Sequence, residues 1–379
     1  MPGRLGIDFG TSNTVVAVWD EERQEGVPLH IPDYGRQIHY RHSDRPGEQI
    51  SVIPSLIHYG PEQRRWLGHQ VLRQDLYDSP RTFRWMKRYI ARRSPVKIRV
   101  DGREISHGEA GRDFLMAVLT FAAAELNHRD EEVALTVPVE AFEHYENWLA
   151  DVAEAAGMPR FRLLDEPSAA ALGYGTVVQP GQVYGIFDFG GGTLDVSVVL
   201  IEEELGQTTG RRCRVLGKAG TDLGGASVDQ WLFQEVLRQN QRSDTDDEVR
   251  QMSRRLLVEC ERAKERLSFQ DQAQIQVQNA ETGFALAATL TRSRLEELFD
   301  EQEAYRQMDH TIRRALNGAR ERGYDEENLK AILLVGGSSM IPSVQRTVQR
   351  IFGRERVLLH RPLDAVARGA AAFVAGIDF

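Results

Sequence analysis

Cysteine is nearly absent from this sequence, since only Cys213 and Cys260 occur among its 379 residues. A disulfide framework is therefore excluded, and the simplest interpretation of the pair is two reduced thiols in a cytoplasmic protein. No apolar run approaches the ~18 residues of a membrane-spanning helix, so we expect no integral membrane protein. The first four residues lead directly into an apolar strand and lack the layout of a secretory signal peptide.

Positive charge is also in short supply. Lys and Arg together number 47 and Asp and Glu 56, which gives a net charge of −9. Domains that bind nucleic acid are usually basic, so we expect no nucleic-acid partner. The basic residues between 81 and 103 are a local exception. We interpret most of them as the solvated face of a helix, with Lys87 as a candidate to turn inward.

Two familiar catalytic motifs are missing, namely the Walker phosphate loop and the Gly-x-Ser-x-Gly nucleophile elbow. The chain instead repeats a strand–turn–strand unit. The turn at residues 8–13 reads Asp-Phe-Gly-Thr-Ser-Asn, and the turn at 188–193 reads Asp-Phe-Gly-Gly-Gly-Thr. The offset of 188 − 8 = 180 residues is close to half the chain, which predicts two homologous lobes facing each other across a cleft.

Alternating strand and helix patterns follow each hairpin and predict α/β lobes with mixed sheets. We expect lobe I at residues 1–178, completed by a C-terminal helix at about 364–379, and lobe II at residues 179–363. The intervals at about 30–105 and 222–290 are expected to be inserted subdomains, one per lobe. Residues 292–322 are expected to form one long helical stretch.

The composition of the repeated turns suits phosphate. Glycine lets the backbone approach a ligand closely, and successive N–H groups form a concavity for phosphate oxygens. A carboxylate at the end of a strand can hold hydrated Mg²⁺. One such turn is weak evidence, because hairpins use these residues anyway. Two copies at symmetric positions predict a phosphate clamp, and a third glycine turn at 336–339 precedes a helix N-terminus that also favours phosphate.

These motifs carry a family resemblance. Residues 6–18, 185–201 and 333–342 resemble the two phosphate motifs and the adenosine motif of the actin-like ATPase superfamily. Within it, the chain is similar to the nucleotide-binding domain of the seventy-kilodalton heat-shock (DnaK-type) chaperones, on the stretches 165–171, 188–195, 260–264 and 364–371. The resemblance implies an actin-like (ribonuclease H-like) α/β fold whose two duplicated lobes surround a central nucleotide cleft.

The resemblance also implies roles for the matching residues. Asp8 and Asp188 would hold Mg²⁺ through water. The implied catalytic residues are Lys87, Glu166, Asp188, Thr193 and Asp195, with Lys87 neutralising charge on the γ-phosphate. The implied nucleotide-binding residues are Gly10, Thr11, Ser12, Asn13, Gly190, Gly191, Gly192, Thr193, Gly224, Gly225, Glu261, Lys264, Ser268, Gly336, Gly337, Ser338, Met340 and Asp364.

The function implied is a slow, Mg²⁺-dependent ATPase that binds ATP and ADP, with K⁺ as an optional second cation. Its nucleotide state would regulate a client-binding domain or a separate protein, with a nucleotide exchange factor or J-type co-chaperone as further partners. Such a site suits phosphoryl transfer, which needs positioning and charge stabilisation more than covalent help. No interdomain linker or substrate-binding domain follows Gly369, so we expect either a longer parent protein or a separate partner.

Several positions depart from the family pattern. Glu265 and Met340 stand where two arginines usually sandwich the adenine. A thioether can pack on a base, but a carboxylate cannot replace a stacking cation, so we expect weaker adenine binding. Pro138 matches a proline linked to signalling between domains, yet the arginine that follows it in the family has no clear counterpart. Two alternatives stay open, a small-molecule kinase on the same fold and a non-catalytic or filament-forming scaffold.

Overall fold

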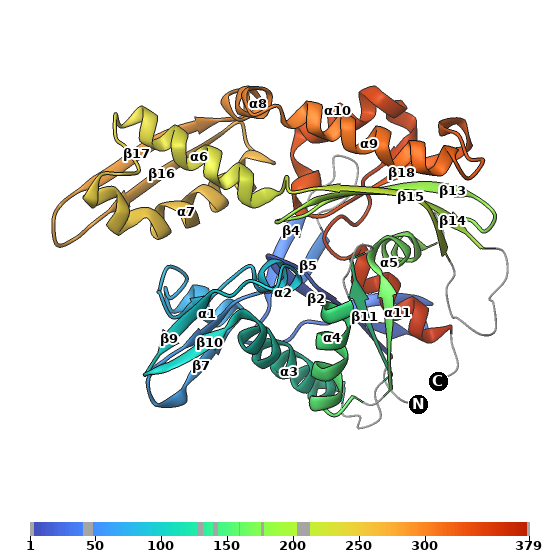
Figure 1. Cartoon of the computed structure of the whole chain (residues 1–379), viewed down its shortest axis with the longest axis horizontal. Coiled ribbons are helices and arrows are strands. Elements are labelled where there is room, and N and C mark those ends of the chain that lie inside the picture. Colours follow the sequence, from blue (N-terminus) through green and yellow to red (C-terminus); the bar gives the residue numbers. More distant parts are fainter. Residues whose placement is uncertain are drawn as a thin grey trace.

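The computed structural model describes residues 4–40, 48–126, 132–138, 143–158, 160–175, 178–202 and 213–376. Two large sheets organise this part of the chain (Figure 1). The first sheet has the order β12-β11-β1-β2-β5-β4, and β3 pairs with β2. Its strands are β1 (Arg4–Phe9), β2 (Asn13–Asp20), β3 (Glu25–Pro28), β4 (Arg36–Tyr40), β5 (Glu48–Pro54), β11 (Glu132–Val137) and β12 (Arg160–Asp165).

The second sheet repeats the plan of the first. Its order is β15-β14-β13-β18-β19, built from β13 (Val183–Phe189), β14 (Leu194–Ile201), β15 (Cys213–Thr221), β18 (Leu329–Val335) and β19 (Val357–Leu358). In each sheet the hairpin's first strand pairs antiparallel with its partner and parallel with a later strand: β1 with β2 and β11, β13 with β14 and β18. The mixed α/β fold expected from the repeated hairpin is therefore confirmed.

Helices cover both faces of each sheet, which explains why β1 and β13 are nearly continuous apolar runs. Between the sheets lie α5 (Glu166–Gly173) and α11 (Ala365–Ala375), which are rich in alanine and pack closely on each other (Figure 1). The first sheet also carries α3 (His107–Leu126) and α4 (Glu143–Ala155), and the second carries α9 (Ala304–Arg320) and α10 (Pro342–Phe352).

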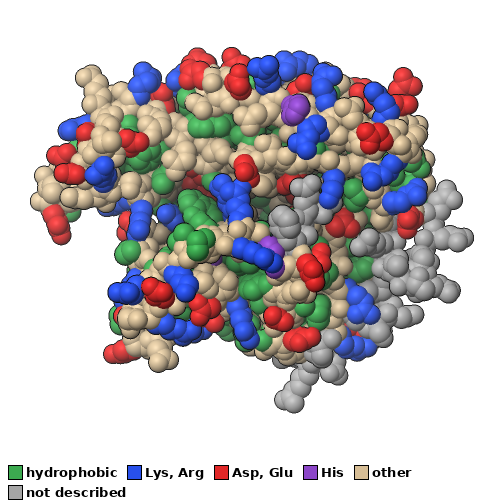
Figure 2. All heavy atoms as spheres, in the orientation of Figure 1, with side chains coloured by type: hydrophobic (Ala, Val, Ile, Leu, Met, Phe, Trp, Pro, Cys, Tyr) green, Lys and Arg blue, Asp and Glu red, His purple; other side chains and the backbone are tan. Residues whose placement is uncertain are grey.

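Two arms extend from the sheets on the same side of the molecule (Figure 1). The first arm, residues 57–106, contains β6 (Ile57–Tyr59), β7 (Arg65–Leu67), α1 (His69–Arg73), β8 (Thr82–Phe83), α2 (Met86–Ala91), β9 (Lys97–Val100) and β10 (Arg103–Ser106). The second arm, residues 225–301, contains α6 (Gly225–Gln239), α7 (Asp247–Leu267), β16 (Gln272–Gln278), β17 (Ala285–Thr291) and α8 (Arg292–Glu301). On the face shown in Figure 2, acidic and basic side chains are interspersed over both arms.

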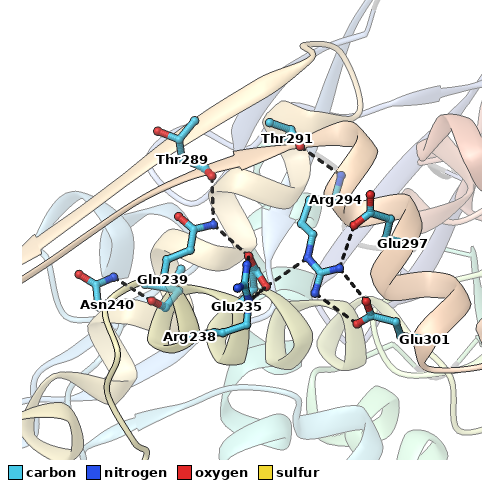
Figure 3. Close-up of polar contacts among 10 residues, drawn as sticks. Glu235, Arg238, Gln239, Asn240, Thr289, Thr291, Arg294, Glu297 and Glu301 are labelled. Carbon is cyan, nitrogen blue, oxygen red and sulfur yellow. Dashed lines mark hydrogen bonds and ion pairs between the residues drawn. The ribbon is translucent and has the colours of Figure 1, made fainter.

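A buried carboxylate fastens α8 to α6 in the second arm (Figure 3). The side chain of Glu235 is only 2% exposed and accepts hydrogen bonds from Arg238, Gln239 and Arg294 at 2.6–3.2 Å. Arg294 is also paired with Glu301, at 2.7 Å. Each buried charge thus has a partner, as a low-dielectric interior requires.

The expectation of one long helix at 292–322 is wrong, because the chain breaks between α8 and α9. Glu303 adopts a left-handed backbone conformation with φ 54°. At about 100° per residue, an unbroken helix would place Met308 on the face opposite Phe299. The break lets both side chains reach the same core, where each is fully buried.

Among the described residues, none of the helices combines the length and the apolar character that a membrane span requires.

Candidate active site

The two repeated turns lie face to face where the hairpin of each sheet ends. A methyl group added at Gly191 would lie 2.2 Å from Ser12 Oγ, and one at Gly192 would lie 3.3 Å from Thr11 Oγ1. Only residues without a side chain allow the second turn to approach the first this closely. The hairpins that are 180 residues apart in sequence therefore form one site.

Hydrogen bonds hold each turn in place. In the first, Ser55 Oγ donates to the Gly10 carbonyl at 2.8 Å, and Asn13 opens β2. In the second, Gly190 O accepts from Gly225 N and from Ser338 Oγ, both at 3.0 Å. The N-terminus of α6 and the turn after β18 are thus fastened to the same peptide.

A cluster of carboxylates around one lysine lies beside the turns. Lys87 Nζ, on α2, donates to Glu166 Oε1 at 2.5 Å, and the two side chains are only 12% and 16% exposed. Thr136 Oγ1, on β11, donates to Asp8 Oδ1 at 3.2 Å. The charges of Asp8, Glu166 and Lys87 all act on Asp188. Lys87 is thus turned inward, as the sequence suggested.

The electrostatics of the cluster follow from burial. Burial raises the pKa of Asp8 to about 6, although Lys87 and the Thr136 hydroxyl oppose the shift. Burial and repulsion by Glu166 and Asp195 raise the pKa of Asp188 well above its usual range. Burial alone would lower the pKa of Lys87, but attraction to the carboxylates outweighs it and raises that pKa. The centre therefore holds a charged lysine and an excess of negative charge.

This excess fits a hydrated divalent cation. No group of three His, Cys, Asp or Glu in the described ranges is placed to ligate a metal directly. Mg²⁺, however, usually keeps several waters and takes one or two carboxylates plus phosphate oxygens. Asp8 and Asp188 supply two partly buried carboxylates beside turns suited to phosphate. Nearby, Thr193 Oγ1 donates to Asp195 Oδ2 at 2.6 Å, which orients this carboxylate.

The residues of the implied adenosine motif separate into two groups. Lys264 contacts the start of α6, which is hydrogen-bonded to the second turn. Its Nζ donates to Gly225 O at 3.1 Å and pairs with Asp229 at 2.8 Å. Glu261 and Glu265 face the first sheet instead. Tyr77 donates to Glu261 at 2.7 Å, and Arg36 on β4 pairs with Glu265 at 3.2 Å.

Glu261 and Glu265 line a pocket between the arms, which begins at residues 11–13 of the first turn. The sequence indicated no role in nucleotide binding for Arg36, Tyr77, Arg84 or Trp85, which form its other wall. Arg84 lies over the rings of Tyr77 and Trp85, each at 4.9 Å. These residues come from outside the recognised motifs, so only the fold brings them to the site.

The remaining motif residues lie at the edges of the site. Met340 is 7% exposed and packs in an apolar cluster with Ile50 and Val52 of β5. Asp364 is 1% exposed and accepts from Arg368 Nε at 2.5 Å. Ser268 caps α7. Gly224 precedes α6, and Gly336 and Gly337 form the turn before α10.

A family model described as "Hsp70 protein" matches residues 4–378. This chain belongs to the Hsp70 family. It is 28% identical over 404 aligned positions to the chaperone protein DnaK of Deinococcus proteolyticus. That alignment covers 98% of this chain and 59% of the relative, so the Hsp70-family chain spans little more than half the length of the DnaK protein. The resemblance drawn from the repeated turns is thereby confirmed at the level of the family and its actin-like fold.

Proposed function

We propose that this Hsp70-family chain binds ATP with Mg²⁺ between its two turns and hydrolyses it slowly. The observation that carries the proposal is the opposition of Thr11 and Ser12 to Gly191 and Gly192, beside a lysine that is 12% exposed and two partly buried aspartates. The sheet of each turn would act as one lobe, residues 1–178 with the C-terminal helix and residues 179–363. ATP touching both turns would bind their closed arrangement better, and this differential affinity would drive closure.

The hydrolytic step is assigned to side chains already in the centre. The turn at residues 190–193 would take the β- and γ-phosphates, with backbone N–H groups of residues 191–193 as donors, since the Gly190 N–H already donates to Thr193 O. Lys87 would turn from Glu166 to the γ-phosphate and offset the charge that builds up there. Glu166 would then accept a hydrogen bond from the attacking water and orient it, and Thr193 and Asp195 would help to orient it from the other sheet. Asp8 and Asp188 would hold the hydrated Mg²⁺, which neutralises charge on the phosphates.

The nucleotide state would be read by a client-binding domain or a partner protein. A second pocket supports such a connection. It is lined by Glu166, Asp188 and Asp195, and also by Pro138, whose family counterpart is linked to signalling between domains. Pro138 thus lies in the same pocket as the carboxylates, where a movement of these side chains on hydrolysis would alter its surroundings.

Calorimetry with ATP and ADP, with and without Mg²⁺, tests the proposal on the parent chain and on Lys87→Ala. The parent should bind both nucleotides and release phosphate to water. Lys87→Ala should retain binding and lose at least about 100-fold in turnover, because the charge on the γ-phosphate is no longer offset. Lys97→Ala, a half-exposed lysine of the first arm, is the matched control and should behave as the parent does.

Three results would contradict the proposal: no binding at millimolar ATP, unchanged turnover in Lys87→Ala, or phosphate delivered to a sugar hydroxyl instead of water. The last would favour the kinase alternative. Nucleotide-dependent pelleting without turnover would favour the scaffold.

A further inference from the structure

Arg84, just before α2, is a cation that the proposed mechanism does not use. Its side chain is partly buried and forms no ion pair or hydrogen bond with any described residue, and its Nη1 atom is fully buried. A buried nitrogen that lacks an acceptor destabilises the folded protein, so its retention needs an explanation. A ligand that accepts hydrogen bonds from the guanidinium would supply one.

Two aromatic rings hold this guanidinium. Arg84 Cζ lies 4.9 Å from the centroid of the Tyr77 ring and the same distance from that of Trp85. The Tyr77 hydroxyl donates to Glu261 on α7 at 2.7 Å, so its ring is fixed between the two arms. Stacking on rings orients a guanidinium and leaves the N–H groups in its plane available to a further partner.

The backbone at Trp85 directs Arg84 and Lys87 to different places. Trp85 lies between β8 and α2 in a left-handed conformation, with φ 55° and ψ 30°, which is costly for a bulky residue. Lys87 reaches Glu166 in the carboxylate cluster, whereas Arg84 lines the pocket that begins at the first turn. One strained turn thus places one cation in the catalytic centre and another in the adjoining pocket.

The charges of this pocket favour an anion. Its lining includes three arginines and two glutamates, namely Arg36, Arg84, Arg262, Glu261 and Glu265. Arg36 is paired with Glu265, and Arg262 with Glu259. Arg84 is therefore the arginine of the pocket that has no acidic partner among the described residues.

A phosphate group is the anion that fits best. The pocket begins at residues 11–13, which belong to a turn suited to phosphate. Phosphate oxygens can accept two parallel hydrogen bonds from a guanidinium, and these charge-assisted bonds are stronger than neutral ones.

We propose that Arg84 is a further nucleotide-binding residue, which holds the phosphate chain from the first arm. Arg84 would contribute to affinity, while Lys87 serves the chemical step. The inference rests on the proposed ATPase function and adds a residue to which the family resemblance gives no role.

Arg84→Met tests the proposal, because it keeps a side chain that packs on both rings but removes the charge and the N–H donors. The Kd values of MgATP and MgADP, by calorimetry, should rise about tenfold, a typical effect of losing a hydrogen bond to a charged group. The single-turnover rate at saturating MgATP should stay within about threefold of the parent, since Lys87 remains. Lys87→Ala should show the reverse, with parent-like binding and lost turnover.

Arg84→Lys and Arg93→Met complete the set. Arg84→Lys keeps the charge but loses the planar fork, so its Kd should lie between those of the parent and Arg84→Met. Arg93 is an exposed residue of the first arm that forms no ion pair with any described residue, so Arg93→Met is the matched control and should bind ATP as the parent does. The Tm without nucleotide should be that of the parent in all three variants, because none of them loses an ion pair.

A parent-like Kd of MgATP in Arg84→Met would overturn the role of Arg84 and leave the proposed function standing. Weaker binding together with a lowered Tm in both Arg84 variants would also overturn it, because it would indicate a structural role. A parent chain that binds no ATP would instead overturn the proposed function, and the role of Arg84 with it.

Discussion

At the scale of single residues, the centre is built for a ligand that brings positive charge. The carboxylates of Asp8, Glu166 and Asp195 all act on Asp188, and the positive charge of Lys87 opposes them. Such a cluster is stable only if some carboxylates keep their protons or a cation enters. Burial is the main reason that the pKa of Asp8 is raised to about 6 from a usual 3.8, and repulsion by Glu166 adds to the shift.

The imbalance predicts how stability depends on pH. Because folding raises the pKa of Asp8, its contribution to stability is fully present below pH 3.8 and is lost as the pH rises through about 6. Relative to Asp8→Asn, the nucleotide-free parent should therefore lose stability between pH 4 and 7, on the order of 3 kcal/mol. Thermal unfolding across this range measures the difference.

Two comparisons sharpen that test. Asp33→Asn, which removes an exposed carboxylate of the Arg73 pair, should show no such trend. Saturating MgATP should reduce the dependence of the parent's stability on pH, because the bound cation then offsets the charge of Asp8 in place of a proton. If the difference in stability between the parent and Asp8→Asn were the same at pH 4 and at pH 7, this interpretation would be contradicted.

The sequence identifies residues that belong to a motif and misses those placed only by packing. Asp8, Asp188 and Lys87 could be predicted from the repeated turns and the resemblance. Arg36 could not, because its contact with Glu265 joins residues 229 apart in the chain and exists only in the assembled fold.

At the scale of elements, the second arm depends on one buried charge. Glu235 accepts hydrogen bonds from two arginines and fastens α6 to α8 (Figure 3). These hydrogen bonds, chiefly the one from Arg238, lower the pKa of Glu235 to about 2. Its contribution to stability is therefore present above pH 4.5 and lost as the pH falls toward 2.

Glu235→Gln should lower the free energy of unfolding by about 3 kcal/mol at pH 7, because it leaves Arg294 without its buried partner. The difference from the parent should shrink below pH 4.5. Urea unfolding at pH 7 and pH 4 measures both effects. Glu301→Gln, at the half-exposed end of the same network, is the control and should change stability by no more than about 0.5 kcal/mol. If Glu235→Gln and Glu301→Gln lowered the free energy of unfolding equally, the burial of Glu235 would not explain its effect on stability.

Element boundaries were predicted best where the local pattern decides them. The two hairpins, observed at residues 4–20 and 183–201, follow from the repeated strand–turn–strand pattern. The break at Glu303 does not, because helical residues continue on both sides of it. It follows from the direction of the core, which only the assembled fold defines.

At the scale of the whole molecule, α7 of the second arm is joined to residues outside that arm. Arg36 of the first sheet pairs with Glu265, and Tyr77 and Asp78 of the first arm meet Glu261 and Arg254. Four of these residues, Arg36, Tyr77, Glu261 and Glu265, line the pocket that begins at the first turn. A nucleotide that extended from the turns into this pocket would lie against the Arg36–Glu265 pair.

Arg36→Gln should therefore speed ADP release. The pair is partly exposed, with side chains 26% and 47% accessible, so we expect an acceleration of only about twofold to fivefold. Stopped-flow release of a fluorescent ADP measures the rate. Arg73→Gln removes a comparable exposed pair away from the pocket and should leave it unchanged. Equal ADP release rates in the parent and in Arg36→Gln would show that this ion pair does not slow the release of ADP.

The central claim is that one Mg²⁺-bound triphosphate lies between the repeated turns. A crystal structure of the chain with Mg²⁺ and a non-hydrolysable ATP analogue tests this claim most directly. The account predicts phosphate oxygens within hydrogen-bonding distance of both Thr11–Ser12 and residues 190–193, with the cation held through water by Asp8 and Asp188. Phosphates that contact only one turn, or an analogue bound elsewhere, would contradict it.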